Sequence, residues 1–262
     1  MRTTGNTVLV TGGATGIGFG LAEAFHRRGN AVLLAGRRED RLREAAERLP
    51  GARWFACDVA DPEQRRALAD WAMKDHPDVN VLVNNAGIQR DIDLTKGVEE
   101  LASGGDELRI DLEAPIWLSQ LFVPHLAGKD DAAIVHVTSG IAFVPSVKAP
   151  LYSTTKAALH VFSQVQRKQL RAAGIRVFEV APPLILDTEL NPEGRAKARA
   201  AAGGVPDAVR YSFMDIPTSA KFAEHVLARM EEDVEEIGYG TSEESIRLSK
   251  GPLERIFNER NP

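Results

Sequence analysis

The chain has 262 residues and a formal net charge of −5, with 44% hydrophobic and 26% charged residues. This composition supplies enough apolar surface for a core and excludes global disorder. The acidic balance, with a sequence pI of about 5.8, argues against a nucleic-acid or membrane-surface partner, since either would favour a basic field. A chain of this length is consistent with a single α/β domain spanning residues 1–262.

Cys57 is the only cysteine, so the chain cannot form an internal disulfide and has no CxxC motif. We expect Cys57 to be a small core residue and expect no metal site. No run of 18 apolar residues is present, and the first ten residues lack the apolar stretch of a secretory signal. These features predict a cytoplasmic protein.

The first 180 residues alternate between β-rich runs and helical patterns. The β-rich runs occupy residues 7–11, 31–35, 53–56, 81–84, 134–138 and 176–181, and the helical patterns occupy 17–28, 38–49, 62–74, 104–126 and 151–173. Strands that alternate with helices need crossover connections and form a parallel sheet. The runs at 8–10 and 32–34 are apolar throughout, as in strands covered on both faces. We therefore predict a doubly wound α/β sheet with its ligand at the carboxyl ends of the strands.

The remainder of the chain completes this sheet. Residues 191–215 are rich in Ala, Gly, Arg and Pro with weak periodicity. They fit a surface helix or, as part of an excursion at about 187–215, a substrate lid. A helix at 219–232, a strand at 236–239 and a charged helix with a tail at 242–262 follow.

A glycine-rich segment joins the first strand to the first helix. Residues 11–18 read TGGATGIG. Glycines permit a tight turn and a close backbone approach to phosphate, and the helix N-terminus adds partial positive charge. We expect a dinucleotide to contact this segment, at Gly12, Ala14, Thr15, Gly16, Ile17 and Gly18; alone, the pattern also fits an ordinary strand-to-helix turn.

Three further strand ends carry candidate cofactor contacts. Arg37 and Arg38 follow the second strand, where an acid would bind the ribose hydroxyl of NAD and an arginine the 2′-phosphate of NADP. The alternative is that these arginines merely begin a charged helix. We also expect contacts from Asp58 and Val59 after the third strand and from a backbone turn after the fourth, made of Asn85, Ala86 and Gly87.

The strongest signal is Ser139 at the end of the fifth strand, followed by Tyr152 and Lys156. Tyr152 and Lys156 are four residues apart and share one face of a predicted helix. Free tyrosine titrates near pH ~10, and a nearby ammonium favours its phenolate form. The bare Tyr-x-x-x-Lys pattern is usually a surface pair, but here all the pieces stand in the order that one site requires.

These motifs, over residues 7–188, resemble the compact branch of the short-chain dehydrogenase/reductase family. The resemblance implies a Rossmann-type fold of three layers, a nicotinamide cofactor and reversible hydride transfer at a carbonyl or alcohol carbon. It also implies that Tyr152 is the general acid/base and that Ser139 binds the substrate oxygen. Lys156 would bind the nicotinamide ribose and lower the pKa of Tyr152, so that both Tyr152 and Lys156 also contact the cofactor.

The sequence departs from the family pattern at two places. Asp111 stands where the family usually has a catalytic Asn, and a carboxylate cannot donate a hydrogen bond as an amide does. Pro183 replaces a usual Gly in the segment that would reach the nicotinamide carboxamide, for which we expect contacts from Pro182 and Ile185.

The combined interpretation is an NADP-dependent oxidoreductase acting on a small, partly apolar substrate. Residues 141, 143, 144 and 149 and the 184–215 excursion would line the pocket. Two alternatives stay open: an NAD-preferring dehydrogenase, and a dinucleotide-binding sensor or structural subunit with weak or no catalysis. By analogy with the family, the two long helices would pair in a homodimer or homotetramer.

Overall fold

A seven-stranded parallel sheet organises the computed structural model, which describes residues 1–102, 106–207 and 215–261, without the side chains of residues 195 and 198. Within these ranges the sheet order is β3-β2-β1-β4-β5-β6-β7. The strands are β1 (Thr7–Thr11), β2 (Ala31–Gly36), β3 (Arg53–Ala56), β4 (Val79–Asn84), β5 (Ala133–Val137), β6 (Arg176–Val180) and β7 (Glu236–Ile237). The order reverses between β1 and β4, and an open parallel sheet binds its ligand at such a switch point.

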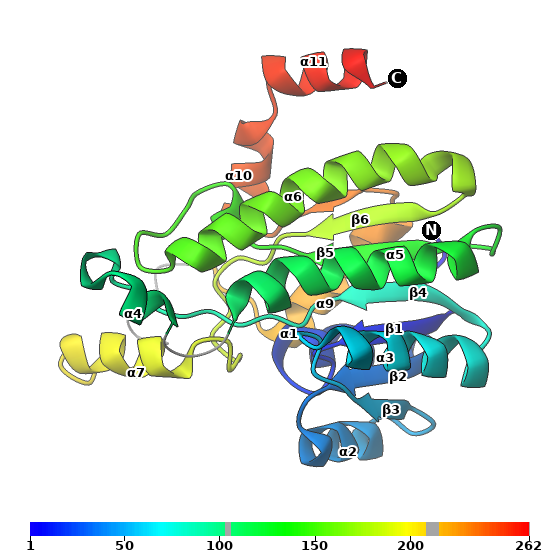
Figure 1. The fold of residues 1–262 in the computed structure, drawn as a ribbon, viewed down its shortest axis with the longest axis horizontal. Helices are drawn as coiled ribbons and strands as arrows, with labels where there is room; N and C mark the ends of the chain where they lie inside the picture. The colour runs from blue at the N-terminus through cyan, green and yellow to red at the C-terminus, as the bar shows by residue number, and fades with distance from the viewer. Residues whose placement is uncertain (103–105, 208–214, 262) are drawn as a thin grey trace.

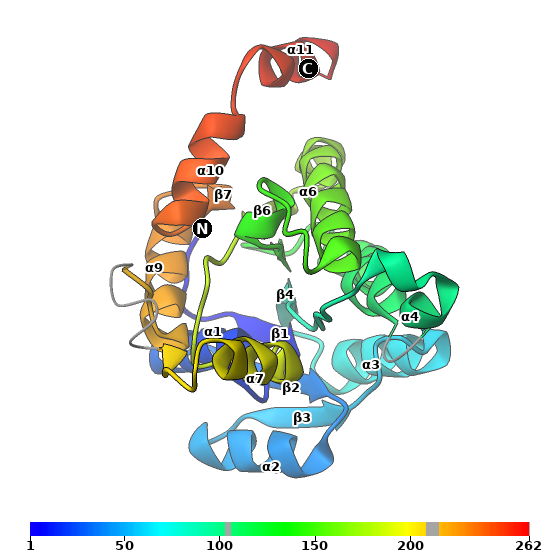
Figure 2. The same ribbon diagram turned by 90° about the vertical axis from the view of Figure 1, so that its left-hand side faces the viewer.

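Helices cover both faces of the sheet (Figures 1 and 2). On one face, α1 (Gly16–Arg27), α2 (Glu39–Arg48) and α9 (Ser219–Glu231) pack with Val8 and Val10. On the other, α3 (Pro62–Asp75) and α5 (Ala114–Leu126) pack with Leu9. The third long helix on that side is α6 (Pro150–Leu170), which runs beside α5 in Figure 1. The predicted doubly wound, three-layer Rossmann-type fold is therefore confirmed.

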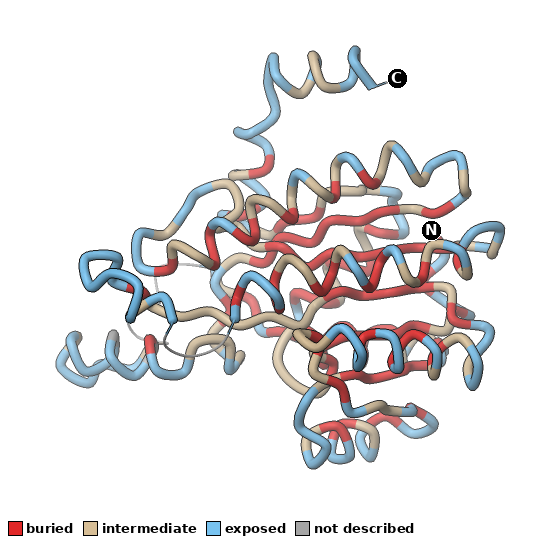
Figure 3. The backbone as a smooth tube through the Cα atoms, in the orientation of Figure 1, coloured by how far each residue is buried: buried red, intermediate tan, exposed pale blue. Residues whose placement is uncertain are grey.

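The sheet forms the core because its strands are apolar on both sides. Figure 3 shows continuous burial along the central strands and exposure on the outer faces of the helices. Cys57 lies in the core, as predicted, and burial raises the pKa of its thiol to about 12. No helix in the described ranges is both long and apolar enough to cross a membrane.

The predicted strands and most predicted helices match the structure within a few residues. The helix predicted at 104–126 differs: residues 104–105 lie outside the described ranges, and the π-helical turn η2 (Arg109–Glu113) precedes α5. The predicted final helix is two, α10 (Thr241–Ser249) and α11 (Pro252–Arg260), because Gly251 and Pro252 interrupt it.

The excursion after β6 and the segment after β4 each contain helices. Helix α7 (Pro192–Ala201) lies within the predicted lid, and residues 208–214 of that lid lie outside the described ranges, so the lid stays a prediction. The turn η1 (Leu94–Lys96) and helix α4 (Val98–Ala102) had no prediction. Both are short, and a short helix gives too few turns for an apolar period to be recognised.

Candidate active site

The glycine-rich segment between β1 and α1 leaves backbone groups free for a ligand. At Gly18, a Cβ would lie 2.3 Å from both the Gly12 carbonyl oxygen and Asn85 Nδ2, so a side chain has no room. Thr15 precedes α1, but its side chain makes no capping hydrogen bond. The first-turn N–H groups of α1 are thus uncapped by Thr15, and such groups bind phosphate well. The loop fits a dinucleotide pyrophosphate.

Asn85 fastens the end of β4 to this loop. Its Nδ2 donates to the carbonyl oxygens of Thr11 at 2.9 Å and Gly12 at 3.3 Å. In return, Thr11 Oγ1 accepts from the N–H groups of Asn85 at 3.0 Å and Ala86 at 3.1 Å. The Asn85 side chain therefore positions the glycine loop, and the 85–87 backbone lies beside it at the switch point.

The ends of β2 and β3 carry the residues expected to face an adenosine, among them two exposed arginines. Arg37 and Arg38 follow β2, and Arg38 forms an ion pair with Glu189. After β3, Asp58 Oδ1 accepts from the N–H of Ala60 at 3.0 Å. The Val59 side chain is buried in the core, so only its backbone can face a ligand.

Ser139, Tyr152 and Lys156 come together at the carboxyl end of β5. Ser139 Oγ accepts from the Ile141 N–H at 3.2 Å, at the start of the turn η3 (Gly140–Ala142). The Tyr152 side chain stands in the first turn of α6, close enough to Ser139 for this side chain to lower the pKa of the Tyr152 hydroxyl. One turn later, Lys156 Nζ lies 5.4 Å from the centroid of the Tyr152 ring and donates to the Val137 carbonyl at 3.1 Å. The sequence motif is thus one contiguous group of side chains.

The surroundings of Tyr152 raise the pKa of its hydroxyl. Burial is the largest cause, the charge of Asp111 adds to it, and the Ser139 side chain acts in the opposite direction. Burial also lowers the pKa of the Lys156 ammonium, against the charge of Asp111. The sequence predicted that Lys156 lowers the pKa of Tyr152. In the structure the pKa is raised instead, because burial and the charge of the Asp111 carboxylate have the larger effect.

Asp111 lies inside this group of side chains, turned inward by η2. A π-helical turn often marks a functional site. The Asp111 side chain is buried, and its Oδ1 accepts from the Ile88 N–H at 2.9 Å. A Cβ on Gly87 would lie 3.1 Å from this Oδ1 and 3.6 Å from Lys156 Nζ, so the carboxyl and the ammonium face the same small space.

The Asp111 carboxyl is able to hold a proton near neutral pH. Burial raises its pKa to about 7, although the charge of Lys156 and the bond from Ile88 lower it. Among the described residues, Oδ2 has no hydrogen-bond partner. In its protonated form, this carboxyl donates a hydrogen bond, as the amide of the family's usual Asn does.

A second buried acid, Glu107, which the sequence analysis did not single out, supports this part of the site. Glu107 accepts from the Arg90 backbone N–H at 3.0 Å and from Arg90 Nε at 3.1 Å. It fixes the segment that follows Gly87, and its charge is a further, smaller cause of the raised pKa of Asp111. Its spacing of four residues before Asp111 on a predicted helix was the available signal.

The segment after β6 spans the site from Ser139 to the glycine loop. The Pro182 carbonyl accepts from the Gly140 N–H at 2.9 Å, and Ile185 is buried in the core. Further on, the Thr188 Cγ2 lies 3.3 Å from the position that a Gly16 Cβ would occupy. Despite Pro183, the segment reaches the glycine loop.

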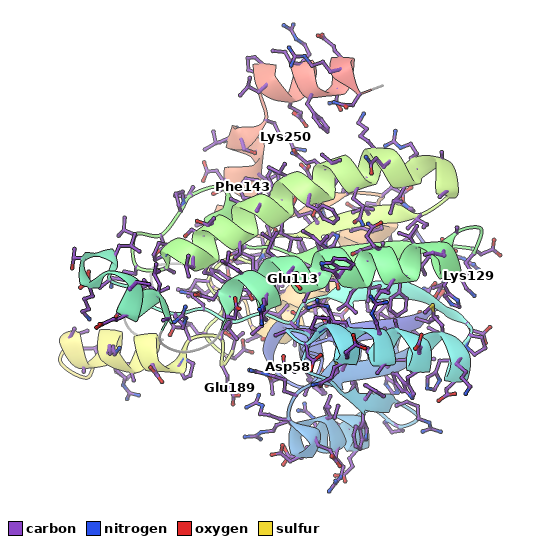
Figure 4. All side chains as sticks on the ribbon, in the orientation of Figure 1. Asp58, Glu113, Lys129, Phe143, Glu189 and Lys250 are labelled. Atoms are coloured by element: carbon purple, nitrogen blue, oxygen red, sulfur yellow. The ribbon has the colours of Figure 1, made fainter. Side chains whose placement is uncertain are left out.

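The residues expected to line the substrate pocket differ in how far they are buried. Ala149 is buried, whereas Val144 is exposed. The Phe143 and His160 rings make a T-shaped contact, with 4.7 Å between their centroids, and Figure 4 labels Phe143 beside α6. Their part in substrate binding stays a prediction.

Comparison with known proteins identifies relatives over the whole length. The family described as short chain dehydrogenase matches residues 6–199. The uncharacterized oxidoreductase DltE of Bacillus subtilis (strain 168) is 44% identical over 261 residues, covering 100% of this chain and 98% of DltE. An oxidoreductase of Staphylococcus saprophyticus is 28% identical over 188 residues, covering 70% of this chain and 79% of that protein.

Solved structures show the same fold. The L-sorbose reductase of Gluconobacter frateurii, solved with NADPH and L-sorbose, has a TM-score of 0.75 and 27% identity, covering 91% of this chain and 96% of that one. A short chain dehydrogenase/reductase of Burkholderia phymatum, solved with NAD, has a TM-score of 0.79 and 21% identity, covering 100% and 98%. The expected family is therefore confirmed, and the chain belongs to the short-chain dehydrogenase/reductase family of oxidoreductases.

Proposed function

We propose that this protein is an NADP(H)-dependent enzyme that interconverts a carbonyl group and an alcohol on a small, partly apolar substrate. The observation that carries this proposal is the grouping of Tyr152, close to Ser139, with Lys156 one helical turn away and 5.4 Å from the centroid of the Tyr152 ring. The three side chains lie at the carboxyl end of the sheet, where an open α/β fold binds its ligand.

The chain offers a set of groups for the cofactor. The uncapped N–H groups of α1 suit the pyrophosphate, and Arg37 and Arg38 suit a 2′-phosphate, which NAD lacks. Lys156 is the candidate for the nicotinamide ribose. When bound, the cofactor supplies or accepts the hydride. The G. frateurii reductase was solved with NADPH and the B. phymatum protein with NAD, so the two arginines carry our preference for NADP(H).

The protein groups handle the substrate oxygen and its proton. Ser139 donates a hydrogen bond to the oxygen, on which negative charge develops during reduction. Tyr152 donates the proton, and its raised pKa means that it holds this proton at neutral pH. Asp111, with a pKa of about 7 beside Lys156, then connects the site to a proton source. In the oxidation direction the same groups act in reverse order.

Two further features belong to the proposal. The outer surfaces of α5 and α6 expose Trp117, Val161 and Val165, which suits pairing with a second copy. The single thiol, Cys57, excludes an internal disulfide, and this agrees with the reducing cytoplasm as the working compartment.

Cofactor oxidation tests the proposal. Purified protein should consume NADPH in the presence of a ketone, an aldehyde, an imine or a keto sugar, and should consume NADH more slowly. Faster consumption of NADH would favour the NAD-preferring alternative. Tight NADPH binding without turnover on the whole panel would favour the sensor alternative and contradict the proposed activity.

A further inference from the structure

Glu189 forms a contact that the proposed reaction does not use. Its Oε2 accepts from both terminal nitrogens of Arg38, Nη1 and Nη2, at 3.2 Å each, across 151 residues of sequence. Arg38 stands between β2 and α2, and Glu189 stands between β6 and α7. In Figure 4, Glu189 is labelled between α7 and the β2–α2 region.

The backbone on both sides of Glu189 is fixed by side chains. Two residues earlier, the Asp187 carboxylate accepts from the Ser219 N–H at 3.0 Å and from its hydroxyl at 2.8 Å. Two residues later, Asn191 Nδ2 donates to Asp91 Oδ1 at 2.9 Å. Because both flanks are held, the carboxylate of Glu189 is kept within reach of Arg38.

The ion pair lies at the edge of the expected cofactor site. Thr188, the preceding residue, lies beside the glycine loop, with its Cγ2 3.3 Å from the position that a Gly16 Cβ would occupy. A cavity of about 360 Å³ beside this loop is lined by Gly16, Arg41 and Asp187, among others. The pKa of Arg41 is raised mainly by its hydrogen bond and ion pair with Glu44, and also by the charge of Glu189. Glu189 is thus an acidic residue among the basic groups expected to receive a 2′-phosphate.

We propose that Glu189 competes with the 2′-phosphate of NADP(H) for Arg38, and so sets how strongly the enzyme prefers NADP(H) over NAD(H). This inference rests on the proposed function, in which Arg37 and Arg38 bind that phosphate. To bind it, Arg38 must release Glu189, and the carboxylate left nearby repels the phosphate. NAD(H) has a hydroxyl in place of the 2′-phosphate, so its binding neither requires Arg38 to release Glu189 nor brings a phosphate close to the carboxylate.

The exposure of the Arg38 and Glu189 side chains determines how strongly Glu189 weakens NADPH binding. The Arg38 and Glu189 side chains are 53% and 57% exposed, so their attraction is weakened by water and salt. Removing the charge of Glu189 should therefore tighten NADPH binding only about three- to fivefold at low salt. The gain should shrink as salt concentration rises.

Binding measurements on the full chain test the inference. Dissociation constants of NADPH, NADH, 2′,5′-ADP and 5′-AMP would be measured by calorimetry for the wild type and for Glu189→Gln. The variant should bind NADPH and 2′,5′-ADP more tightly, with NADH and 5′-AMP unchanged. Glu193→Gln is the matched control, since it removes the same charge from the same segment and should alter none of the four constants.

A double variant links the effect to Arg38. In an Arg38→Gln background, Glu189→Gln should lose most of its benefit for 2′,5′-ADP. An equal gain for phosphorylated and unphosphorylated ligands, or no gain at all, would overturn the inference. Failure of the proposed function would be seen in a different measurement. If the wild type reduces carbonyls with NADH only, the assignment of NADP(H) as cofactor is wrong. The ratio of 2′,5′-ADP affinity to 5′-AMP affinity in the wild type and in Glu189→Gln still decides the role of Glu189.

Discussion

At the scale of single residues, Tyr152 carries the proposed proton transfer. Tyr152→Phe keeps the ring's packing but removes the transferable proton. We expect turnover to fall at least about 10²-fold, the scale typical of losing a general acid, with little change in NADPH affinity. Steady-state kinetics and a binding titration on the same folded variant check both parts. A folded, cofactor-binding variant with wild-type turnover would remove Tyr152 from the mechanism.

The substitution Asp111→Asn tests the proton relay. With a pKa of about 7, Asp111 loses its donor proton as pH rises through neutrality, whereas an amide donates at every pH. We expect the variant to retain or exceed wild-type turnover, with its largest relative gain near pH 8. A pH–rate profile of both proteins is the measurement. A hundredfold loss in a folded variant would show instead that the carboxylate itself is needed.

The same side chain makes stability depend on pH. Its folded-state pKa of about 7 lies above the ordinary value of 3.8, so the folded protein holds a proton that the unfolded chain releases between these values. The free energy of unfolding should therefore decrease as pH rises from 4 to 7, by up to about 4 kcal/mol from this residue. In Asp111→Asn, denaturant titrations should show a smaller decrease; an unchanged pH dependence would contradict the buried, raised-pKa carboxyl.

At the scale of elements, the junction of β2 and α2 should determine cofactor choice. A charge-assisted contact to the 2′-phosphate is worth on the order of 1.5–3 kcal/mol, so we expect NADPH to bind at least about tenfold tighter than NADH. Arg37→Asp should reverse the preference if Arg37 makes this contact. Fluorescence titration with both cofactors measures it, and equal dissociation constants for the wild type would contradict the prediction.

The elements show why sequence patterns located most of the site. Buried strands such as 8–10 are apolar throughout, and the residue after each strand end reaches one edge of the sheet, so Ser139 could be placed at that edge in advance. The four-residue spacing put Tyr152 and Lys156 on one face of the helix that follows. Contacts between distant segments have no local pattern. The pair of Arg38 with Glu189, and the direction of the Tyr152 pKa, depend on tertiary packing that brings a carboxylate close.

At the scale of the whole molecule, α5 and α6 lie side by side with apolar outer residues. We expect a dimer or tetramer in light scattering. The double substitution Trp117→Glu with Val161→Glu should yield a smaller species, because it puts charges into a buried interface. Val147→Glu is the control: Val147 is an exposed valine outside both helices, and its replacement should not change the mass. A monomeric wild type would contradict the pairing.

The central claim is hydride transfer assisted by Tyr152, and isotope transfer tests it most directly. NADPH deuterated at the transferable position of its nicotinamide would be incubated with a reactive carbonyl substrate and the protein. We predict that the wild type yields an alcohol with deuterium on the carbinol carbon, and that Tyr152→Phe forms it at least about 100-fold more slowly. An unlabelled alcohol, or equal rates for the two proteins, would contradict the account.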